Sequence, residues 1–324
     1  MYRKYNFKSA FKTKALTLLF AIITAPALNA ETFPESVFVS LKHAGKVAKF
    51  NPSAKWTGGP NMLYEAITPD GKRLLVTSPS KQSVYVFDTK SGKQLKIIKV
   101  GKASKGIKIS PNGAEAYVSN EGENSISVID LSSDKVVAKI PTAKMPHNVR
   151  FNNDGSIAYV TLQGGAGLGV IDTKLRRVIK IIPTPGLVGP HNLDLSKDEK
   201  IAFVRDTVNH VAVVDLVKGT VIRLVKVGFG HSGIDVSPDG KYVYTGAIAG
   251  NTVTVIDSKS YAVVKTIKVG KGPHGLRTSK NSRWLYVSVT AGNSLVVIDT
   301  KTFKITSQLK LKGFPFWVAV NGNP

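Results

Sequence analysis

The sequence predicts an all-β fold made of seven copies of one four-stranded unit, and three observations carry that prediction. Aspartates that close an alternating apolar run recur every 42 or 43 residues: Asp88, Asp130, Asp172, Asp215, Asp257 and Asp299. Short runs rich in Val, Ile and Tyr alternate with turn residues. The two ends of the chain hold complementary parts of one unit. A repeat of this length is typical of β-propeller blades, so we expect a seven-bladed β-propeller over residues 31–324.

Two strands of the unit are read from their apolar alternation and from the turns that follow them. The first strand ends in a small polar residue in most copies: 37–40, 74–77, 116–119, 158–161, 202–205, 243–245 and 285–288. The second strand leads to the recurrent Asp: 47–50, 84–88, 126–130, 169–172, 211–215, 253–257 and 295–299. An Asp followed by short polar residues favours an Asx turn, because its carboxylate accepts from nearby backbone amides.

The third recurring segment begins near Pro-His in several copies and should be the innermost strand of its blade. Its copies are residues 62–68, 104–110, 146–152, 190–195, 232–237, 273–279 and 315–320. The fourth strand varies more and is rich in Lys. Lysines on an outermost strand keep a sheet edge from pairing with other molecules. The formal net charge of +24 also leaves open a polyanion, such as nucleic acid, bound by this basic perimeter.

The ends of the chain predict how the ring closes. The chain opens with the middle strands of a unit at 37–50 and stops after an opening strand at 315–320. Joining these pieces completes the seventh blade, with N- and C-terminal strands sharing one sheet. Closure of this kind removes the exposed edges that an open array would have to cap.

Residues 1–30 have the layout of a secretory signal peptide. Five basic residues precede the apolar run 15–23, and small residues follow to Ala27 and Ala30, the two candidate cleavage points. The apolar run is too short for a membrane span, so no transmembrane anchor is expected. The sequence contains no cysteine, which excludes disulfides and thiolate ligands. We therefore expect a periplasmic or secreted protein.

Histidines at the start of the innermost strands are the main candidates for function. His147, His191 and His274 share one position of the repeat, and His231 lies one position away. Converging imidazoles without thiolates suit copper or haem iron, which makes His147, His191 and His274 a candidate metal site. Two alternatives remain open. The imidazoles could satisfy backbone groups as part of the repeat, or one could act in acid–base catalysis.

Further candidates come from residues that depart from the repeat near the same end of the ring. Lys105 takes the place of the aligned histidine, Glu65 interrupts its inner strand, and Arg205 replaces the small polar residue at a strand end. An ion pair of Arg205 with Glu65 or Asp206 is one arrangement open to them. Propeller lactonases and lyases place carboxylates beside such histidines, and Asp194 and Asp235 are further candidates. No Gly-x-Ser-x-Gly nucleophile motif is present.

Two segments carry a resemblance to a known family. Residues 116–140 (AYVSNEGENSISVIDLSSDKVVAKI) and 286–305 (YVSVTAGNSLVVIDTKTFKI) resemble the YVTN-type β-propeller repeat, and the likeness extends over the chain after the leader. More distantly, VGKGPHG at 269–275 is similar to the propeller of cytochrome cd-type nitrite reductases and their maturation proteins. That likeness implies a haem held non-covalently through His, in propellers of eight blades.

These observations favour a non-catalytic binding or scaffold protein. Its ligand-binding residues would be His147, His191, His231, His274, Lys105, Glu65 and Arg205 at the channel mouth. The expected occupant is a small ligand or a metal, with copper or non-covalent haem as the candidate cofactor, and the expected partner is another periplasmic protein. The alternatives are a lactonase-like hydrolase or lyase, a haem-handling protein, and a polyanion-binding protein.

Overall fold

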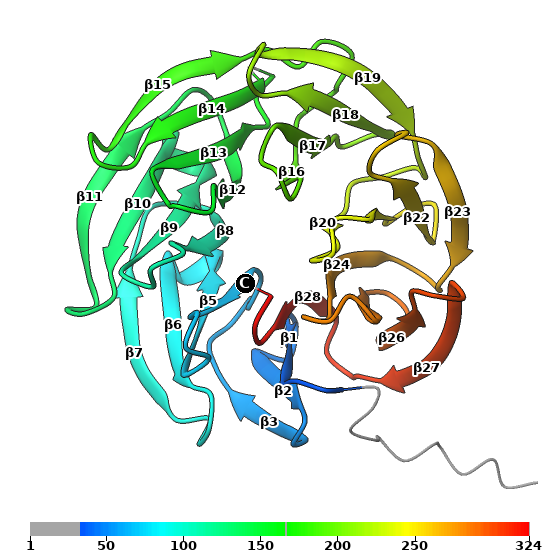
Figure 1. The fold of residues 1–324 in the computed structure, drawn as a ribbon. Coiled ribbons are helices and arrows are strands. Elements are labelled where there is room, and N and C mark those ends of the chain that lie inside the picture. Colours follow the sequence, from blue (N-terminus) through cyan, green and yellow to red (C-terminus); the bar gives the residue numbers. More distant parts are fainter. Residues whose placement is uncertain (1–32, 166, 324) are drawn as a thin grey trace, which may run out of the picture.

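The computed structural model describes residues 33–165 and 167–323, and the predicted leader at 1–30 lies outside them. These residues form seven four-stranded antiparallel sheets arranged as blades of a ring (Figure 1). The prediction of an all-β, seven-bladed propeller is confirmed. No helix in the described part of the chain is both long and apolar enough to cross a membrane.

The two strands nearest the ring axis correspond to the third and first recurring segments of the sequence. The inner strands are β4 (Glu65–Ile67), β8 (Ser104–Ile109), β12 (Pro146–Phe151), β16 (Asn192–Leu195), β20 (Ile234–Val236), β24 (Pro273–Thr278) and β28 (Pro315–Val320). Next to them lie β5 (Arg73–Ser78), β9 (Glu115–Asn120), β13 (Ile157–Leu162), β17 (Ile201–Arg205), β21 (Tyr242–Ala247), β25 (Trp284–Val289) and β1 (Val37–Leu41).

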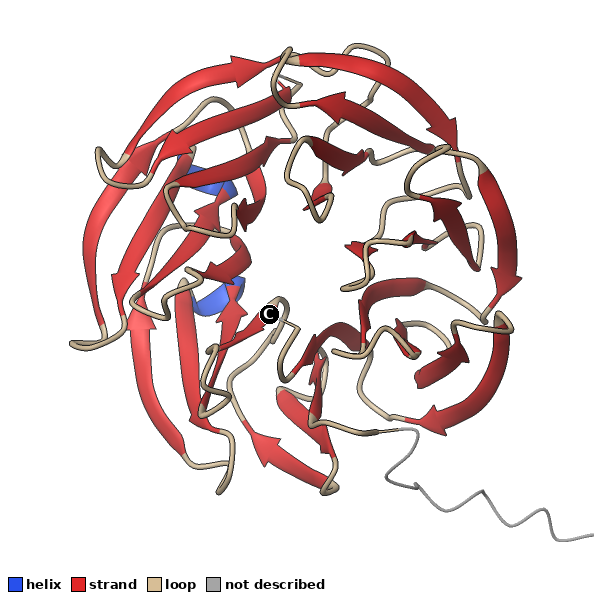
Figure 2. Ribbon diagram, viewed as in Figure 1, coloured by secondary structure: helices blue, strands red, loops and turns tan. Residues whose placement is uncertain are grey.

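The outer half of each blade contains the Asp-ending strand and the lysine-rich strand. The third strands are β6 (Ser83–Asp88), β10 (Ser125–Asp130), β14 (Gly167–Asp172), β18 (His210–Asp215), β22 (Thr252–Asp257), β26 (Ser294–Asp299) and β2 (Lys46–Phe50). The outermost are β7 (Gln94–Lys99), β11 (Lys135–Pro141), β15 (Arg177–Ile182), β19 (Thr220–Lys226), β23 (Val263–Lys268), β27 (Lys304–Lys310) and β3 (Ala54–Thr57). Two short 3-10 helices, η1 (Pro79–Lys81) and η2 (Glu121–Glu123), lie in the connections between β5 and β6 and between β9 and β10 (Figure 2).

The ring closes as the ends of the sequence predicted. Strand β28, from the C-terminal end, pairs antiparallel with β1 from the N-terminal end, with Val37 opposite Val320. The resulting sheet has the order β28-β1-β2-β3. The first and last described segments therefore hydrogen-bond to each other, and the inner strand of this blade has a partner like the other six.

The recurrent aspartates make turns, which confirms the expectation from the sequence. The Asp88 carboxylate accepts from the Ser91 backbone amide at 2.7 Å, and the Asp257 carboxylate accepts from Ser260 at 2.8 Å. Equivalent bonds to the residue three positions on occur at Asp130, Asp172, Asp215 and Asp299. These carboxylates hold the hairpin between the third and outermost strands.

The hydrophobic core lies between neighbouring blades. One cluster joins Leu75 and Val86 of one blade to Ile109 and Val118 of the next, all of them buried. Alternation along each strand puts one set of apolar side chains on either face, so every blade packs against two neighbours. The outermost strands are mostly exposed, with exposed lysines such as Lys96 and Lys268. The rigid inner strands thus surround a central channel, in which the candidate site lies.

Candidate functional site

A left-handed residue introduces each inner-strand segment and sets the direction in which the chain enters the channel. Positive φ values occur at the residue before the Pro-His pair or its equivalent: Asn61, Ala103, Met145, Gly189, Gly230, Gly272 and Phe314. Glycine adopts this conformation at little cost, which accounts for the Gly in the Gly-Pro-His motifs. The primary role of the motif is therefore to turn the backbone so that the following residues lie at one mouth of the channel. We call this end the upper mouth.

A β-bulge then turns the histidine inward. The pairing of β12 with β13 shifts between Pro146 and Val149, and that of β24 with β25 shifts between Pro273 and Leu276. In a regular strand, residues two positions apart share a face. Without the shift, His147 would therefore point into the core with Val149, and His274 would point into the core with Leu276. The bulge re-aims both imidazoles into the channel.

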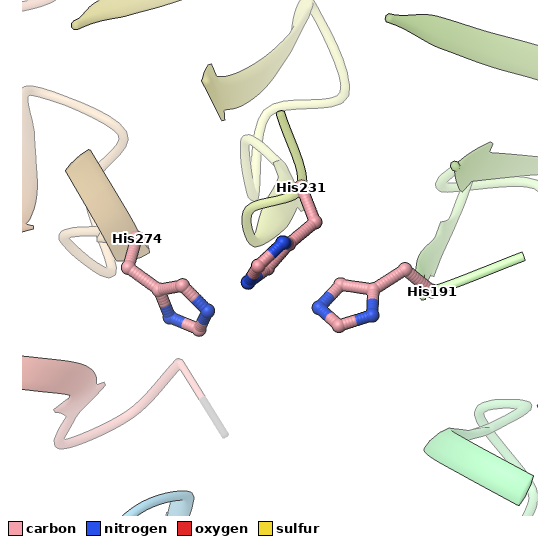
Figure 3. A group of neighbouring side chains, drawn as sticks. All are labelled: His191, His231 and His274. Atoms are coloured by element: carbon pink, nitrogen blue, oxygen red, sulfur yellow. The ribbon is translucent and has the colours of Figure 1, made fainter. Parts of the chain in front are cut away.

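Three histidines from neighbouring blades converge at the upper mouth. His191, His231 and His274 each offer a nitrogen, and these three atoms lie within 4.8 Å of one another (Figure 3). The ring centroids of His191 and His231 are 4.6 Å apart, and those of His231 and His274 are 5.3 Å apart. His191 and His274 are buried, whereas His231 is half-buried on the segment before β20. We call this group the three-histidine cluster.

Neighbouring groups fix how two of these rings present their nitrogens. The amide oxygen of Gln163 lies 2.9 Å from His191 Nδ1, and the carbonyl of Phe316 lies 3.3 Å from His274 Nδ1. Both oxygens only accept, so each Nδ1 carries the proton and donates. The buried His191 Nε2 has no hydrogen-bond partner among the described residues, and its lone pair is directed into the cluster. Orientation by a second hydrogen bond is typical of metal-ligating histidines.

The surroundings keep the cluster neutral. Burial lowers the pKa of His191 and of His274 well below the usual value, and the nearby His147 and His231 lower both further. Burial, then the charges of His147 and Arg205, lower the pKa of His231 to about 4. At neutral pH the three imidazoles are therefore uncharged, which is the form that binds a metal ion.

His147 lies beside the cluster, but both of its nitrogens are already engaged. Its Nε2 lies 2.7 Å from the Tyr64 hydroxyl, and its Nδ1 contacts the Glu121 carboxylate. Glu121 can only accept, so Nδ1 is protonated and Nε2 accepts from Tyr64. The ring stacks on His191 with centroids 3.8 Å apart. The metal set predicted from the sequence (His147, His191 and His274) thus differs from the three-histidine cluster in one member.

Lys105 and Glu121 form the charged side of the upper mouth. Lys105 Nζ lies 3.4 Å from Glu121, which also contacts His147. Burial alone would raise the pKa of Glu121, but His147 and Lys105 lower it overall, so the carboxylate is ionised. Lys105 therefore balances the charge of Glu121 and lies near the histidines, as its aligned position predicted.

Arg205 acts on the backbone that carries His231. Its guanidinium pairs with Asp206 at 2.6 Å, and both side chains are fully buried. It also donates to the carbonyls of Gly228 and Gly230 at 2.9 and 2.5 Å. Burial lowers the pKa of Arg205 to about 10, and Asp206 opposes that shift. Of the two partners considered from the sequence, the structure gives Asp206, and the pair fastens the loop that ends at His231.

Glu65 lies in the packing between blades. It occupies the position that carries Ile107 and Val149 in the next two blades and is 3% exposed. Burial raises its pKa well above the usual value, although the backbone amides of Ala319 and Ser40 oppose the rise. Neither carboxyl oxygen has a hydrogen-bond partner of ordinary geometry in the described chain. Glu65 is therefore separate from the three-histidine cluster.

The two remaining candidate carboxylates form ion pairs lower in the channel. Asp194 pairs with Arg150 at 2.5 Å, and Asp235 pairs with Arg277 at 2.6 Å. Asp235 also accepts from the backbone amide and hydroxyl of Thr278, both at 2.7 Å. Neither carboxylate contacts a histidine of the cluster by a hydrogen bond in the described residues. The acid–base arrangement considered from the sequence is not assembled from these groups.

Three residues of the site were missed from the sequence. Glu121 and Gln163 occupy equivalent positions directly after the second strand of their blades, and each contacts the histidine of the next blade. A long polar side chain at that position, in a blade followed by Pro-His, is the signal that could have found them. Tyr64 stands where other blades carry Gly, Asn or Trp, such as Gly106 and Asn148. Its hydroxyl reaches across the channel, which no local pattern reveals.

Comparison with known proteins agrees with the architecture. The sequence model of the YNCE-like beta-propeller family matches residues 51–184 and 188–284. Kuenenia stuttgartiensis hydrazine synthase is similar in structure, with a TM-score of 0.71 and 20% identity over 82% of this chain and 91% of that one. A functionally unknown protein from Desulfotomaculum acetoxidans DSM 771 gives a TM-score of 0.76 and 17% identity, over 90% of this chain and 100% of that one. No curated protein matches the sequence. At these identities the two structures share the fold alone.

Proposed function

The chain belongs to the YNCE-like beta-propeller family, and within that fold we propose that it is a non-catalytic protein that binds one divalent transition-metal ion at the three-histidine cluster. One observation carries the proposal. The buried Nε2 of His191 has no partner among the described residues, while its Nδ1 is fixed by Gln163. An unpaired polar atom in the interior is costly unless a ligand satisfies it.

The geometry of the cluster supports a metal ion. Metal–imidazole bonds of about 2.0–2.1 Å in a tetrahedral site separate the ligand nitrogens by about 3.4 Å. The three nitrogens of the cluster lie within 4.8 Å of one another. Small side-chain rotations that move each nitrogen by on the order of 1 Å would bring them to the separation of a tetrahedral site. Three ligands leave a fourth position for water or a small ligand. Imidazole donors without thiolates favour copper, which also binds more tightly than zinc at nitrogen ligands.

A metal ion fits this group better than a haem. The rings of His191, His231 and His274 approach with centroids 4.6 to 6.4 Å apart. Haem iron is bound by one or two axial ligands that face an extended macrocycle. Three imidazoles this close share one small ion instead. Export to the periplasm, inferred from residues 1–30, would expose the protein to metal ions supplied from outside the cell.

The test is metal binding by protein that has been stripped with a chelator and dialysed against copper or zinc. The expected result is one ion per chain. His231→Gln removes a proposed ligand and should weaken binding at least tenfold. His147→Gln is the matched control, because His147 already uses both nitrogens and should leave the stoichiometry unchanged. No bound ion in the wild type, or equal losses in both variants, would overturn the proposal.

Polyanion binding by the outer ring is a second candidate, supported by the formal charge of +24 and the exposed lysines of the outermost strands. Binding of this type falls steeply as salt increases, because phosphate contacts release counterions. His231→Gln should leave it unchanged. A nucleic acid affinity insensitive to salt would contradict this candidate.

A further inference from the structure

A second ring of charged side chains lies further down the channel. One position of the inner strands, three residues beyond the aligned histidines, carries Ala66, Lys108, Arg150, Asp194, Asp235, Arg277 and Ala319 in blade order. At about 3.3 Å per residue, this ring lies about 10 Å along the channel from the histidines. Tyr64 and Trp317, with ring centroids 4.6 Å apart, lie between the two levels and contact His274. The lower ring is therefore a separate feature.

The charges of this ring do not balance. Asp194 and Asp235 are engaged with Arg150 and Arg277, and their other oxygens accept from the backbone amides of Val236 and Thr278. Lys108 is left over. The residue is 8% exposed, and its amine forms no hydrogen bond or ion pair among the described residues. A buried cation of this kind is costly without a counter-charge.

Lys108 lines two cavities. One is a small cavity of about 20 Å³, lined also by Arg277, Ala66 and Ala319, which has room for about one water-sized group. The other has a volume of about 310 Å³, opens at the lower end of the channel, and is lined by Lys108, Arg150 and Asn323. Ala66 and Ala319 leave space for a ligand in this ring, because the other five blades place a charged side chain at the same position.

We propose that Lys108, with Arg277 and Arg150, forms a binding site for a small oxyanion at the lower end of the channel. The ligand class is a phosphate or carboxylate anion that enters from the lower mouth. An oxyanion supplies the directly bonded anionic partner that Lys108 lacks among the described residues, and the two arginines add positive potential while keeping their aspartate partners. The amide of Asn323, which donates to the Thr278 carbonyl at 2.8 Å, lies at the same opening.

The charged groups around Lys108 also favour an anionic ligand. Burial, then the charges of Arg150 and Arg277, lower the pKa of Lys108 well below its usual value, although Asp194 and Asp235 oppose the shift. A bound anion would raise the pKa of Lys108 and so favour its ammonium form. Glu65 lines the smaller cavity, but burial raises its pKa well above the usual value, which favours the neutral acid and weakens its repulsion of an anion.

The experiment measures the melting temperature against inorganic phosphate, and separately against acetate, at constant ionic strength maintained with chloride. The expected result is a saturable rise in melting temperature for the wild type with at least one probe, since a ligand that binds only the folded state stabilises it. Lys108→Met should weaken the apparent affinity at least tenfold. Lys197→Met is the control, because it removes the same charge from an exposed turn near the lower mouth.

The outcomes separate clearly. Phosphate preferred over acetate indicates a tetrahedral anion, and the reverse indicates a carboxylate; either supports the site. No saturable shift in the wild type, or an equal shift in Lys108→Met, overturns it. Crystals soaked in bromide give a second measurement that does not depend on a variant. Anomalous density beside Lys108 supports the proposal, and bromide found only at the outer lysines contradicts it. Neither result depends on metal binding at the three-histidine cluster.

Discussion

At the scale of single residues, the histidines at the upper mouth differ in whether a ring nitrogen remains available for a metal ion. His147 donates to Glu121 and accepts from Tyr64, so it has no nitrogen left for a metal. His191 and His274 donate through Nδ1 and leave Nε2 available. The sequence could predict that these histidines share one end of the channel. It could not predict their partners, because Glu121 and Gln163 belong to other hairpins.

Glu65 provides a residue-scale prediction that is independent of any ligand. Its carboxyl is buried and has no side-chain partner among residues 33–165 and 167–323, at a position where other blades carry Val149 or Val318. Glu65→Val, which is close in volume, should raise the free energy of unfolding at pH 7 by about 1–3 kcal/mol. Urea denaturation of both proteins measures the difference.

The same pair of proteins tests the pH dependence. The pKa of Glu65 is raised in the folded state, so its stabilising contribution is complete below about pH 4.5, the unfolded value, and is lost as the pH rises through the folded value. The advantage of Glu65→Val should therefore grow as the pH rises above about 4.5. A variant less stable than the wild type, or a constant difference across pH, would contradict the burial of an unpaired acid.

At the scale of elements, the segment before each inner strand determines where the histidines point. The Gly-Pro-His motif was recognised from the sequence, and its glycines take positive φ, as at Gly189 and Gly272. The inclusion of His231 could not be predicted, because it lies one position away from the aligned histidines. In that blade β20 begins only at Ile234. Residues 231–233 therefore precede the strand, and the directions of their side chains do not follow its alternation. Arg205 holds this segment instead.

Gly272 gives a prediction at this scale. Its φ is +81°, and a Cβ there would lie 2.4 Å from the Thr290 hydroxyl oxygen, which donates to the Gly272 carbonyl. Gly272→Ala should lower the free energy of unfolding by about 2–3 kcal/mol, from backbone strain and the clash together. Chemical denaturation measures the loss.

Gly113→Ala is the matched control for Gly272. Its φ is +72°, but the nearest atom to a Cβ there is Pro69 Cδ at 3.4 Å, an ordinary contact. This variant should lose only about 1 kcal/mol, from strain alone. If both variants lose the same free energy of unfolding, close packing against Thr290 does not constrain the backbone that leads into β24, the strand of His274.

At the scale of the whole molecule, the repeat period and the complementary chain ends were sufficient to predict the fold. Six aspartates spaced 42 or 43 residues apart leave little freedom in topology, and β28 pairs with β1 as the ends required. The function was harder to predict because the site is made by contacts across the channel. His191, His231 and His274 are about 40 residues apart in the sequence and meet because three successive blades pack around one axis. Local patterns report strands and turns, whereas the side-chain partners depend on the exact rotation between blades.

The central claim is that three blades supply one metal site. The most direct measurement is X-ray absorption at the zinc edge, on protein loaded with one equivalent of zinc. The account predicts scattering from about three imidazole nitrogens at about 2.0–2.1 Å, with one further non-imidazole ligand, such as a water oxygen, completing the shell. It also predicts that His231→Gln loses one imidazole while His147→Gln loses none. A spectrum with one imidazole or none, or one that changes in His147→Gln and not in His231→Gln, would contradict the claim.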